Sequence, residues 1–263
     1  MAREKTASQQ TSEDVDPRLF VASIEKAMAV LELFESERQD LSLTEIMARA
    51  GIGRSAVQRF VYTLHRLGYL SRDPATKRFA LGAKVLGLHR GYVGGRSALQ
   101  RARHVLRELN ATTGECVSWT ELLETEIVVV ENWPSAHVTA VILAPGMRFE
   151  AISASSGQVL LAHAPAEVVA HAFAAATPRA RERLGARTLP EFGAILDRVR
   201  SQGYALTTKA FDQDSISLSA PVLDPGGRAV GAVNLSVLTN RFDRRQAEDA
   251  LVPALIKAAR ASR

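Results

Sequence analysis

Five side chains that can form hydrogen bonds recur along one stretch of the chain at the spacing of a helix face. They are Arg54, Ser55, Gln58, Arg59 and Tyr62. Arginine, glutamine and serine side chains can bond to the edges of bases, and arginine, serine and tyrosine can also bond to phosphates. The pattern therefore predicts a helix that reads double-stranded DNA through its major groove.

The same stretch carries a second, apolar face. Its members follow one another at intervals of one or three residues, and they are Val57, Phe60, Val61, Leu64 and Leu67. That spacing predicts a helix over 54–67 with one buried side. Before it, Gly51 can end a shorter helix over 44–50, and Ser42 and Glu45 have the spacing of a capping box at its start. Together the two segments predict a helix-turn-helix whose second helix is the recognition helix.

A β-hairpin is expected directly after the recognition helix. Two short extended runs, 68–72 and 77–81, flank a turn that contains Pro74. A hairpin in this position would be a wing. The basic residues on or beside its tip are Arg72, Lys77 and Arg78. We expect them to contact phosphates or the neighbouring minor groove, the alternative being a purely structural hairpin with exposed charges.

The distribution of charge favours a polyanionic partner. The net charge is +5, but residues 49–103 hold twelve Lys and Arg against one acid, Asp73, which gives this block a net charge of +11. Residues 1–48 carry a net charge of −5 and residues 104–263 a net charge of −1. Such a basic block attracts nucleic acid with an affinity that falls steeply with salt. The alternative is a solvated basic surface without a partner.

Length and composition limit the class of protein. A chain of 263 residues allows one or two domains, each with its own core. The single cysteine, Cys116, excludes an intramolecular disulfide framework. The sequence has no run of about 18 apolar residues and no secretory segment at its start, so we expect a cytoplasmic protein without a membrane span.

The pattern of elements predicts an α+β protein with two domains. We expect a disordered leader over 1–19, a winged helix-turn-helix over 20–82, a linker helix over 83–95 and an effector-binding domain over 96–263. In the last of these, strands are expected at 116–123, 126–133, 138–143, 203–206, 216–224 and 229–238, and helices at 156–164, 166–175, 190–201 and 243–259. A mixed sheet with helices on its faces would form a sensor domain.

The sequence offers no constellation of catalytic residues. Its histidines lack metal-binding spacing, and there is neither a G-x-S-x-G elbow nor a phosphate loop. Cys116 lies in an apolar strand pattern, which is typical of an inert buried thiol. We therefore expect no enzyme, metal or cofactor. Two alternatives stay open: an enzyme with an N-terminal interaction module, and a nucleoid protein that binds nucleic acid without regard to sequence.

Several short motifs resemble those of the IclR family of bacterial transcriptional regulators over roughly residues 20–260. The motifs occur at 20–23, 41–46, 58–59, 67–70, 113–115, 203–205 and 220–222. The resemblance implies a GAF-like effector-binding domain and operator DNA as partner. It also implies a homodimer that can pair into a dimer of dimers.

The same resemblance implies a small-molecule pocket between the sheet and the helix after its third strand. When the pocket positions of the family are matched to this sequence one at a time, the polar candidates for ligand contact are Ser155, Ser156, Thr207, Ser217, Asn234 and Ser236. Candidates for an apolar wall are Trp119, Met147, Phe149 and Phe211. Segment 151–154 replaces the commoner proline- and histidine-containing entry to the pocket helix, and segment 207–210 replaces the usual acidic run. The loss of these acids makes the pocket less negative, so we expect an organic acid as effector, aromatic or aliphatic. The alternative is a set of exposed polar positions on a half-solvated sheet.

Overall fold

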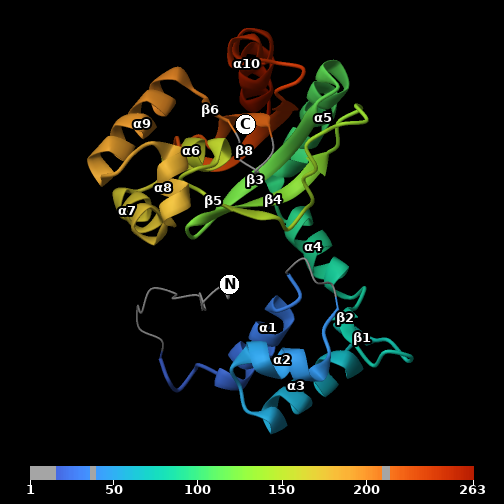
Figure 1. Ribbon diagram of the computed structural model, residues 1–263. Coiled ribbons are helices and arrows are strands. Elements are labelled where there is room, and N and C mark those ends of the chain that lie inside the picture. Colours follow the sequence, from blue (N-terminus) through green and yellow to red (C-terminus); the bar gives the residue numbers. More distant parts are fainter. Residues whose placement is uncertain (1–15, 36–39, 209–213) are drawn as a thin grey trace. The chain divides into compact units, whose positions relative to one another are not determined.

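The computed structural model describes residues 16–35, 40–208 and 214–263. The chain divides into two compact units, Met1–Gly91 and Tyr92–Arg263, and each is described by itself (Figure 1). The boundary between them falls inside the segment expected as a linker, where the structure has helix α4 (Val85–Gly94). Most of the expected leader lies outside the described residues.

Three helices form the core of the first unit. They are α1 (Ala22–Glu32), α2 (Leu43–Ala50) and α3 (Arg54–Arg66). The capping box at the start of α2 is confirmed, because the Glu45 N–H donates to the Ser42 hydroxyl and the Ser42 N–H donates to the Glu45 carboxylate. Gly51 ends α2 in the left-handed conformation with φ 63°, as the sequence predicts.

Only the second half of α1 packs into this core. Val30 near its end and Phe34 just beyond it are buried, whereas Ile24 and Met28 are 60% and 47% exposed. The helix therefore supports the helix-turn-helix through its C-terminal end, and its first turns present apolar side chains to the surface of the unit.

The predicted wing is present as a two-stranded antiparallel hairpin. Strand β1 (Leu70–Arg72) pairs with β2 (Phe79–Leu81). Leu41 forms a single antiparallel bridge to the hairpin, because its backbone N–H and C=O both bond to the backbone of Phe79 at 2.8 Å. The wing is thus joined through the backbone to the residue before the α2 cap.

The second unit is built on one six-stranded sheet. The strands are β3 (Cys116–Leu123), β4 (Glu126–Trp133), β5 (Arg148–Glu150), β6 (Ala205–Thr208), β7 (Ser215–Leu223) and β8 (Ala229–Leu238). Their order is β5-β4-β3-β8-β7-β6, and each neighbouring pair is antiparallel. The expectation of a mixed sheet is therefore wrong for the described strands. The strand expected at 138–143 is also absent, and β5 lies a few residues later.

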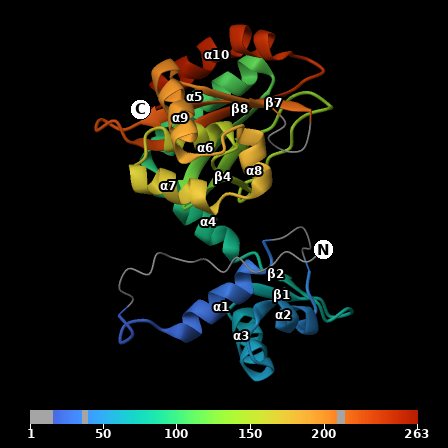
Figure 2. The same cartoon turned by 60° about the vertical axis from the view of Figure 1, so that its left-hand side comes forward.

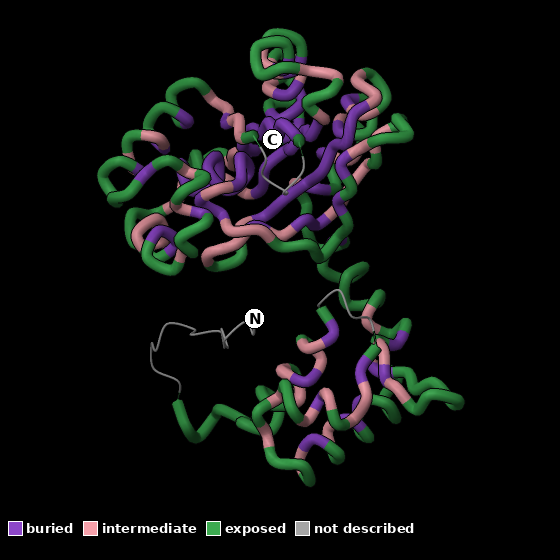
Figure 3. Tube along the Cα trace, viewed as in Figure 1, coloured by how far each residue is buried: buried purple, intermediate pink, exposed green. Residues whose placement is uncertain are grey.

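Helices cover both faces of this sheet (Figures 1 and 2). One face packs against α5 (Ser97–Thr113) and α10 (Arg244–Ala261). The other packs against α6 (Ser155–Leu161), α7 (Ala166–Ala175), α8 (Pro178–Leu184) and α9 (Leu189–Gln202). The sequence analysis missed α8, which consists of only seven residues. Strands β3, β7 and β8 and helix α6 are the most continuously buried parts of the unit (Figure 3).

Candidate nucleic-acid interface and effector site

The recognition helix α3 is buried on one side and exposed on the other. Val57, Val61 and Leu64 pack in the core of the first unit. All five predicted reading residues are exposed, and Tyr62 keeps 66% of its surface accessible. The fold therefore presents on one helix face the side chains that sequence analysis selected, in the arrangement that entry into a major groove requires.

A tight turn shapes the tip of the wing. One carboxylate oxygen of Asp73 accepts the backbone N–H groups of Ala75 and Thr76, at 2.7 Å each. These two hydrogen bonds, the one from Thr76 first, hold the pKa of Asp73 below its ordinary value. Lys77 follows with a positive φ of 59°, a conformation that few side chains adopt.

Two of the three basic wing residues lie at the surface of the unit. The Arg72 guanidinium lies 5.5 Å from the centroid of the Phe79 ring, and its Nε donates to the Lys77 carbonyl at 3.4 Å. Arg72 and Lys77 are both exposed. The aromatic ring and the carbonyl orient Arg72 on the strand without covering it, so its charge remains accessible to a phosphate.

Arg78, the third basic residue, is engaged inside the protein. Its guanidinium pairs with Asp40 at 3.2 Å and with Glu45 at 2.7 Å, and it donates to the Asp40 carbonyl at 3.1 Å. The Ser42 hydrogen bonds, together with Arg78, lower the pKa of Glu45 to about 2. Arg78 therefore fastens the wing to the start of α2, while its side chain stays 30% exposed, and the DNA contact that the sequence suggested stays a prediction.

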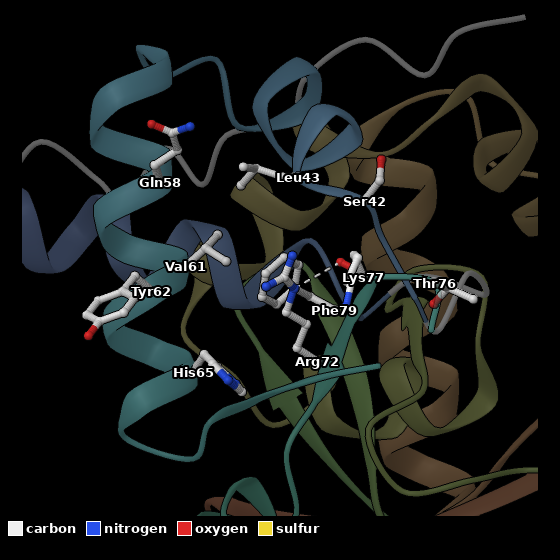
Figure 4. Close-up of a pocket in the computed structure, with 10 residues that line it drawn as sticks. All are labelled: Ser42, Leu43, Gln58, Val61, Tyr62, His65, Arg72, Thr76, Lys77 and Phe79. Atoms are coloured by element: carbon white, nitrogen blue, oxygen red, sulfur yellow. Dashed lines mark hydrogen bonds between the residues drawn. The ribbon is translucent and has the colours of Figure 1, made fainter. Parts of the chain in front are cut away.

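A groove runs between α3 and the wing (Figure 4). Its lining residues are Ser42, Leu43, Gln58, Val61, Tyr62, His65, Arg72, Thr76, Lys77 and Phe79. His65 is fixed by a 3.0 Å hydrogen bond between its Nδ1 and the Leu70 carbonyl and by an edge contact with Phe79. The carbonyl can only accept, so Nδ1 carries the proton. Reading residues of α3 thus lie on one wall of the groove and basic wing residues on the other.

In the second unit, polar side chains gather in the interior on the sheet face that α6 covers. Ser217 donates to the Asn234 side-chain oxygen at 2.9 Å and lies 3.1 Å from the Ser236 hydroxyl. Asn234 donates to Ser236 at 3.1 Å and to Ser118 at 3.5 Å. Each of these four residues is at most 2% exposed. Neighbouring antiparallel strands bring them together, because Ser217 pairs with Ser236 and Ser118 with Asn234.

Thr207 faces the same cluster from the next strand. It pairs with Ser217, so the two side chains share one face of the sheet. Its hydroxyl is buried and has no hydrogen-bond partner among the described residues. A buried hydroxyl without a partner is unfavourable, and the position therefore has unused bonding capacity on the sheet face that carries the polar cluster.

Helix α6 closes over the cluster at short range. The Ser155 hydroxyl lies 2.9 Å from that of Ser219, and Ser156 is buried beside it. Gly157 lets the helix pack tightly against the turn that precedes it, because a Cβ there would overlap the backbone of Ala151. The helix has only seven residues and the Ser155 hydroxyl is already engaged, so the anion site that the sequence suggested at this helix start has weak support.

The candidates for an apolar wall are separated by the sheet. Phe149 lies on the face of the polar cluster, where it packs against Val129, Val141 and Leu143. Met147 is 40% exposed, and its sulfur accepts the Ala144 N–H at 3.3 Å. Phe211 lies outside the described residues.

Trp119 is on the opposite face, in the core beneath α5 and α10. Side chains alternate along a strand, so Trp119 points away from its neighbours Ser118 and Thr120. The expectation that Trp119 forms part of the pocket wall is therefore wrong.

Sequence analysis missed Ser118, a member of the cluster, and Gln158, a buried polar residue of the helix that covers it. Ser118 accepts from Asn234, and Gln158 donates to the Ile152 carbonyl at 3.1 Å beneath α6. The alternation of Ser118 and Thr120 with apolar neighbours could have indicated that one face of this strand is polar. Gln158 left no such signal, because its position depends on how α6 docks.

The described residues add no catalytic feature. Burial raises the pKa of Cys116 to about 12, so the thiol keeps its proton. Across 16–35, 40–208 and 214–263, no group of three or more His, Cys, Asp or Glu is placed to hold a metal ion. No helix in these ranges has both the length and the apolar character needed to cross a membrane.

A winged helix-turn-helix with an exposed polar recognition helix, followed by an α/β unit with an internal polar cluster, defines a class of ligand-responsive DNA-binding regulators. Two family models match the chain: the bacterial transcriptional regulator IclR C-terminal domain over residues 91–262, and the IclR helix-turn-helix domain over residues 23–74. The chain belongs to the IclR family. It is a transcriptional regulator with an effector-binding domain and not an enzyme, as the sequence motifs predicted.

Individual relatives extend this comparison over nearly the whole chain. The p-hydroxybenzoate hydroxylase transcriptional activator of Acinetobacter baylyi is 30% identical over 93% of this chain and 92% of its own length. A solved structure of a candidate regulator from Rhodococcus sp. RHA1 is 28% identical, with a TM-score of 0.78 over 92% of this chain and 97% of its own. An IclR homologue from Microbacterium hydrocarbonoxydans, solved in complex with 4-hydroxybenzoate, shares the fold at 22% identity, with a TM-score of 0.77 over 91% of this chain and 97% of its own.

Proposed function

We propose that the chain binds operator DNA through α3 and its wing, and that an aromatic carboxylic acid in the second unit modulates this binding. The proposed functional segments are a winged helix-turn-helix over 20–82, a linker helix over 83–95 and an effector-binding domain over 96–263. The observation that carries the proposal is the exposed reading face of α3 opposite the basic wing, across one groove. The protein would act in the cytoplasm, where the chromosome is accessible.

The groove suggests how the DNA contacts are divided. Gln58 and Arg59 on the exposed face of α3 are the proposed base readers, since their planar ends can form bidentate bonds to adenine and guanine. Arg54, Ser55 and Tyr62 would contact bases or phosphates. Arg72 and Lys77 on the other wall would bind the sugar-phosphate backbone that passes between helix and wing.

A single recognition helix covers only a few base pairs, so a homodimer is required for a specific operator. We propose two half-sites one turn of DNA apart, ~34 Å, or a multiple of that distance. Pairing of such dimers into a tetramer would extend the operator further.

The polar cluster is the proposed effector site. Its groups at Ser217, Asn234 and Ser236 can exchange their mutual hydrogen bonds for bonds to a ligand, and the Thr207 hydroxyl has no hydrogen bond to the described residues that a ligand would have to replace. Phe149 supplies an aromatic ring on the same face. A small ligand with a ring and a polar end fits this combination. Two relatives point to the same chemistry by their names, so 4-hydroxybenzoate is the first compound to test.

The test is a mobility shift of the intergenic DNA beside the gene, with salt and 4-hydroxybenzoate varied. We expect a discrete complex that weakens with salt and whose affinity changes with the compound. A smear on any DNA would instead support the nucleoid alternative. A discrete complex that ignores every carboxylate in a panel of aromatic and aliphatic acids would contradict the effector class and leave the DNA-binding role intact.

A further inference from the structure

Glu121, near the end of β3, is a nearly buried carboxylate with three partners. It is 8% exposed. One oxygen accepts the indole N–H of Trp119 at 2.9 Å, and the other accepts the Tyr92 hydroxyl at 2.7 Å. The Nε of Arg96 lies 3.3 Å from that second oxygen. A buried carboxylate requires such partners, and these three come from β3, from the end of α4 and from the residue that precedes α5.

The partners from the linker side fix the last turn of α4 to the second unit. Arg96 donates to the Tyr92 hydroxyl at 2.7 Å, and its guanidinium lies 4.3 Å from the centroid of the Tyr92 ring. Next to Tyr92, Val93 is 4% exposed in the core, and its carbonyl accepts the Gln100 side-chain N–H at 2.8 Å. Burial and the neighbouring carboxylate raise the pKa of Tyr92, so its phenol keeps the proton that it donates to Glu121.

Strand β3 connects this anchor with the polar cluster. Trp119 and Glu121 project to the face of α5, while Ser118 and Thr120 project to the face of α6. Ser118 bonds to Asn234 of the cluster at 3.5 Å, and the Thr120 hydroxyl bonds to the Ala232 carbonyl on the same strand as Asn234, also at 3.5 Å. A single strand thus contacts the cluster through one face and the end of α4 through the other.

We propose that Glu121 is a positioning residue that holds the end of the linker helix on β3 and couples the effector site to the DNA-binding unit. The inference rests on the proposed function, because it needs an effector at the polar cluster. A ligand that displaces Asn234 or Ser118 would shift β3, and Glu121 would carry the shift to Tyr92 and so to α4. This is a statement of energetic coupling between two sites, and mutation of the anchor measures it.

The first test needs no effector. Amide hydrogen exchange is measured on the α4 segment, Val85–Gly94, in the full-length protein. Glu121→Gln removes the charge, and Tyr92→Phe removes only the hydroxyl. Hydrogen bonds to charged groups are strong enough that we expect exchange in the last turn of α4 to accelerate roughly tenfold in both variants.

The matched control is Glu131→Gln. Glu131 pairs across the sheet with Trp119, and its carboxylate forms an ion pair with Arg103 of α5 at 2.9 Å. Like Glu121, it joins the sheet to a helix on this face, but it has no bond to α4 among the described residues. Exchange of the α4 segment should stay as in the wild type. Equal exchange in wild type and Glu121→Gln, or equal acceleration in Glu131→Gln, would overturn the proposal.

The second test measures coupling. Operator Kd is determined with and without 4-hydroxybenzoate, and binding of the compound is followed by calorimetry. In Glu121→Gln, the compound should bind within about twofold of its wild-type affinity, while its effect on operator Kd falls toward none. Full retention of the effect would contradict the proposal. If the wild type does not bind the compound, the proposed effector class fails, and hydrogen exchange still decides whether Glu121 anchors α4.

Discussion

The Arg78 guanidinium on the wing lies 2.7 Å from the Glu45 carboxylate, the same group that caps the first helix of the helix-turn-helix. One carboxylate thus serves both the start of α2 and the attachment of the wing. The Leu41–Phe79 backbone bridge lies next to it. The wing and the helix-turn-helix are therefore held together, and the orientation of the basic groove depends on an acid that bonds to both Ser42 and Arg78.

The stability of this arrangement should depend on pH through Glu45. Its pKa is about 2 in the folded protein and 4.5 in the absence of structure, so its contribution is complete above pH 4.5 and is lost as the pH falls toward 2. We expect thermal denaturation to show the largest difference between wild type and Glu45→Gln above pH 4.5, and a shrinking difference below it. Glu108→Gln, on the exposed side of α5, is the control. A difference that does not depend on pH would contradict this origin.

The loss of operator affinity in Arg59→Ala should show whether Arg59 contacts a base or a phosphate. If it forms a bidentate bond to a base, Arg59→Ala costs about 1–3 kcal/mol on the operator and relaxes the preference at one base pair. Arg198→Ala, which removes an exposed arginine from α9, should leave the affinity unchanged. Titration by fluorescence anisotropy on operator and on unrelated DNA checks both. An equal loss on the two DNAs would assign Arg59 to a phosphate instead.

The DNA-binding unit is largely predictable from sequence, because its signals are local. The capping residues, the glycine turn and the apolar spacing of α3 lie within a few residues of one another, and each has a single structural meaning. Arg78 is the exception, because its partners lie more than thirty residues earlier in the chain. A basic residue beside a turn looks exposed until the pairing of Leu41 with the wing brings Asp40 next to it.

The effector unit is less predictable, because its site depends on which strands become neighbours. The long strands β3, β4, β7 and β8 agree with the sequence prediction within one residue at each end. Alternation of side chains along β3 places Trp119 and Ser118 on opposite faces of the sheet. Only the antiparallel register with β8 shows that the polar cluster lies on the face of Ser118. In segment 138–143, apolar and polar residues do not alternate regularly. The segment stays outside the sheet, and its Val141 and Leu143 side chains are buried in a small core.

The buried hydroxyl of Thr207, which has no hydrogen-bond partner among the residues that the structure describes, gives a prediction with two opposite parts. Thr207→Val keeps the shape and removes a buried group without a hydrogen bond, so the free energy of unfolding should rise by up to about 1–3 kcal/mol. The same change should weaken effector binding, measured by calorimetry with 4-hydroxybenzoate. Thr208→Val, at an exposed position of the same strand, should do neither. A loss of stability in Thr207→Val would show that the hydroxyl has a partner in the folded protein.

Gly231 should be indispensable to the packing of Trp119. It lies on β8, and a Cβ there would overlap the indole ring, which is fully buried and cannot retreat to the surface. Gly231→Ala should therefore lower the free energy of unfolding by about 1–3 kcal/mol, the usual result of overpacking a core. Displacement of the ring would also break its bond to Glu121, so the emission of Trp119, measured in a Trp133→Phe background, should shift.

Gly193 provides the comparison for this last variant. It lies inside α9, and a methyl group added there would meet no atom within 4 Å apart from its chain neighbours and the backbone of its own helix, so Gly193→Ala should raise stability by up to about 1 kcal/mol through better helix propensity. Unfolding in urea, followed by circular dichroism, separates the two effects. If Gly231→Ala were as stable as the wild type and kept its emission spectrum, the indole would have room to move, and the tight contact between β8 and Trp119 would not constrain the anchor at Glu121.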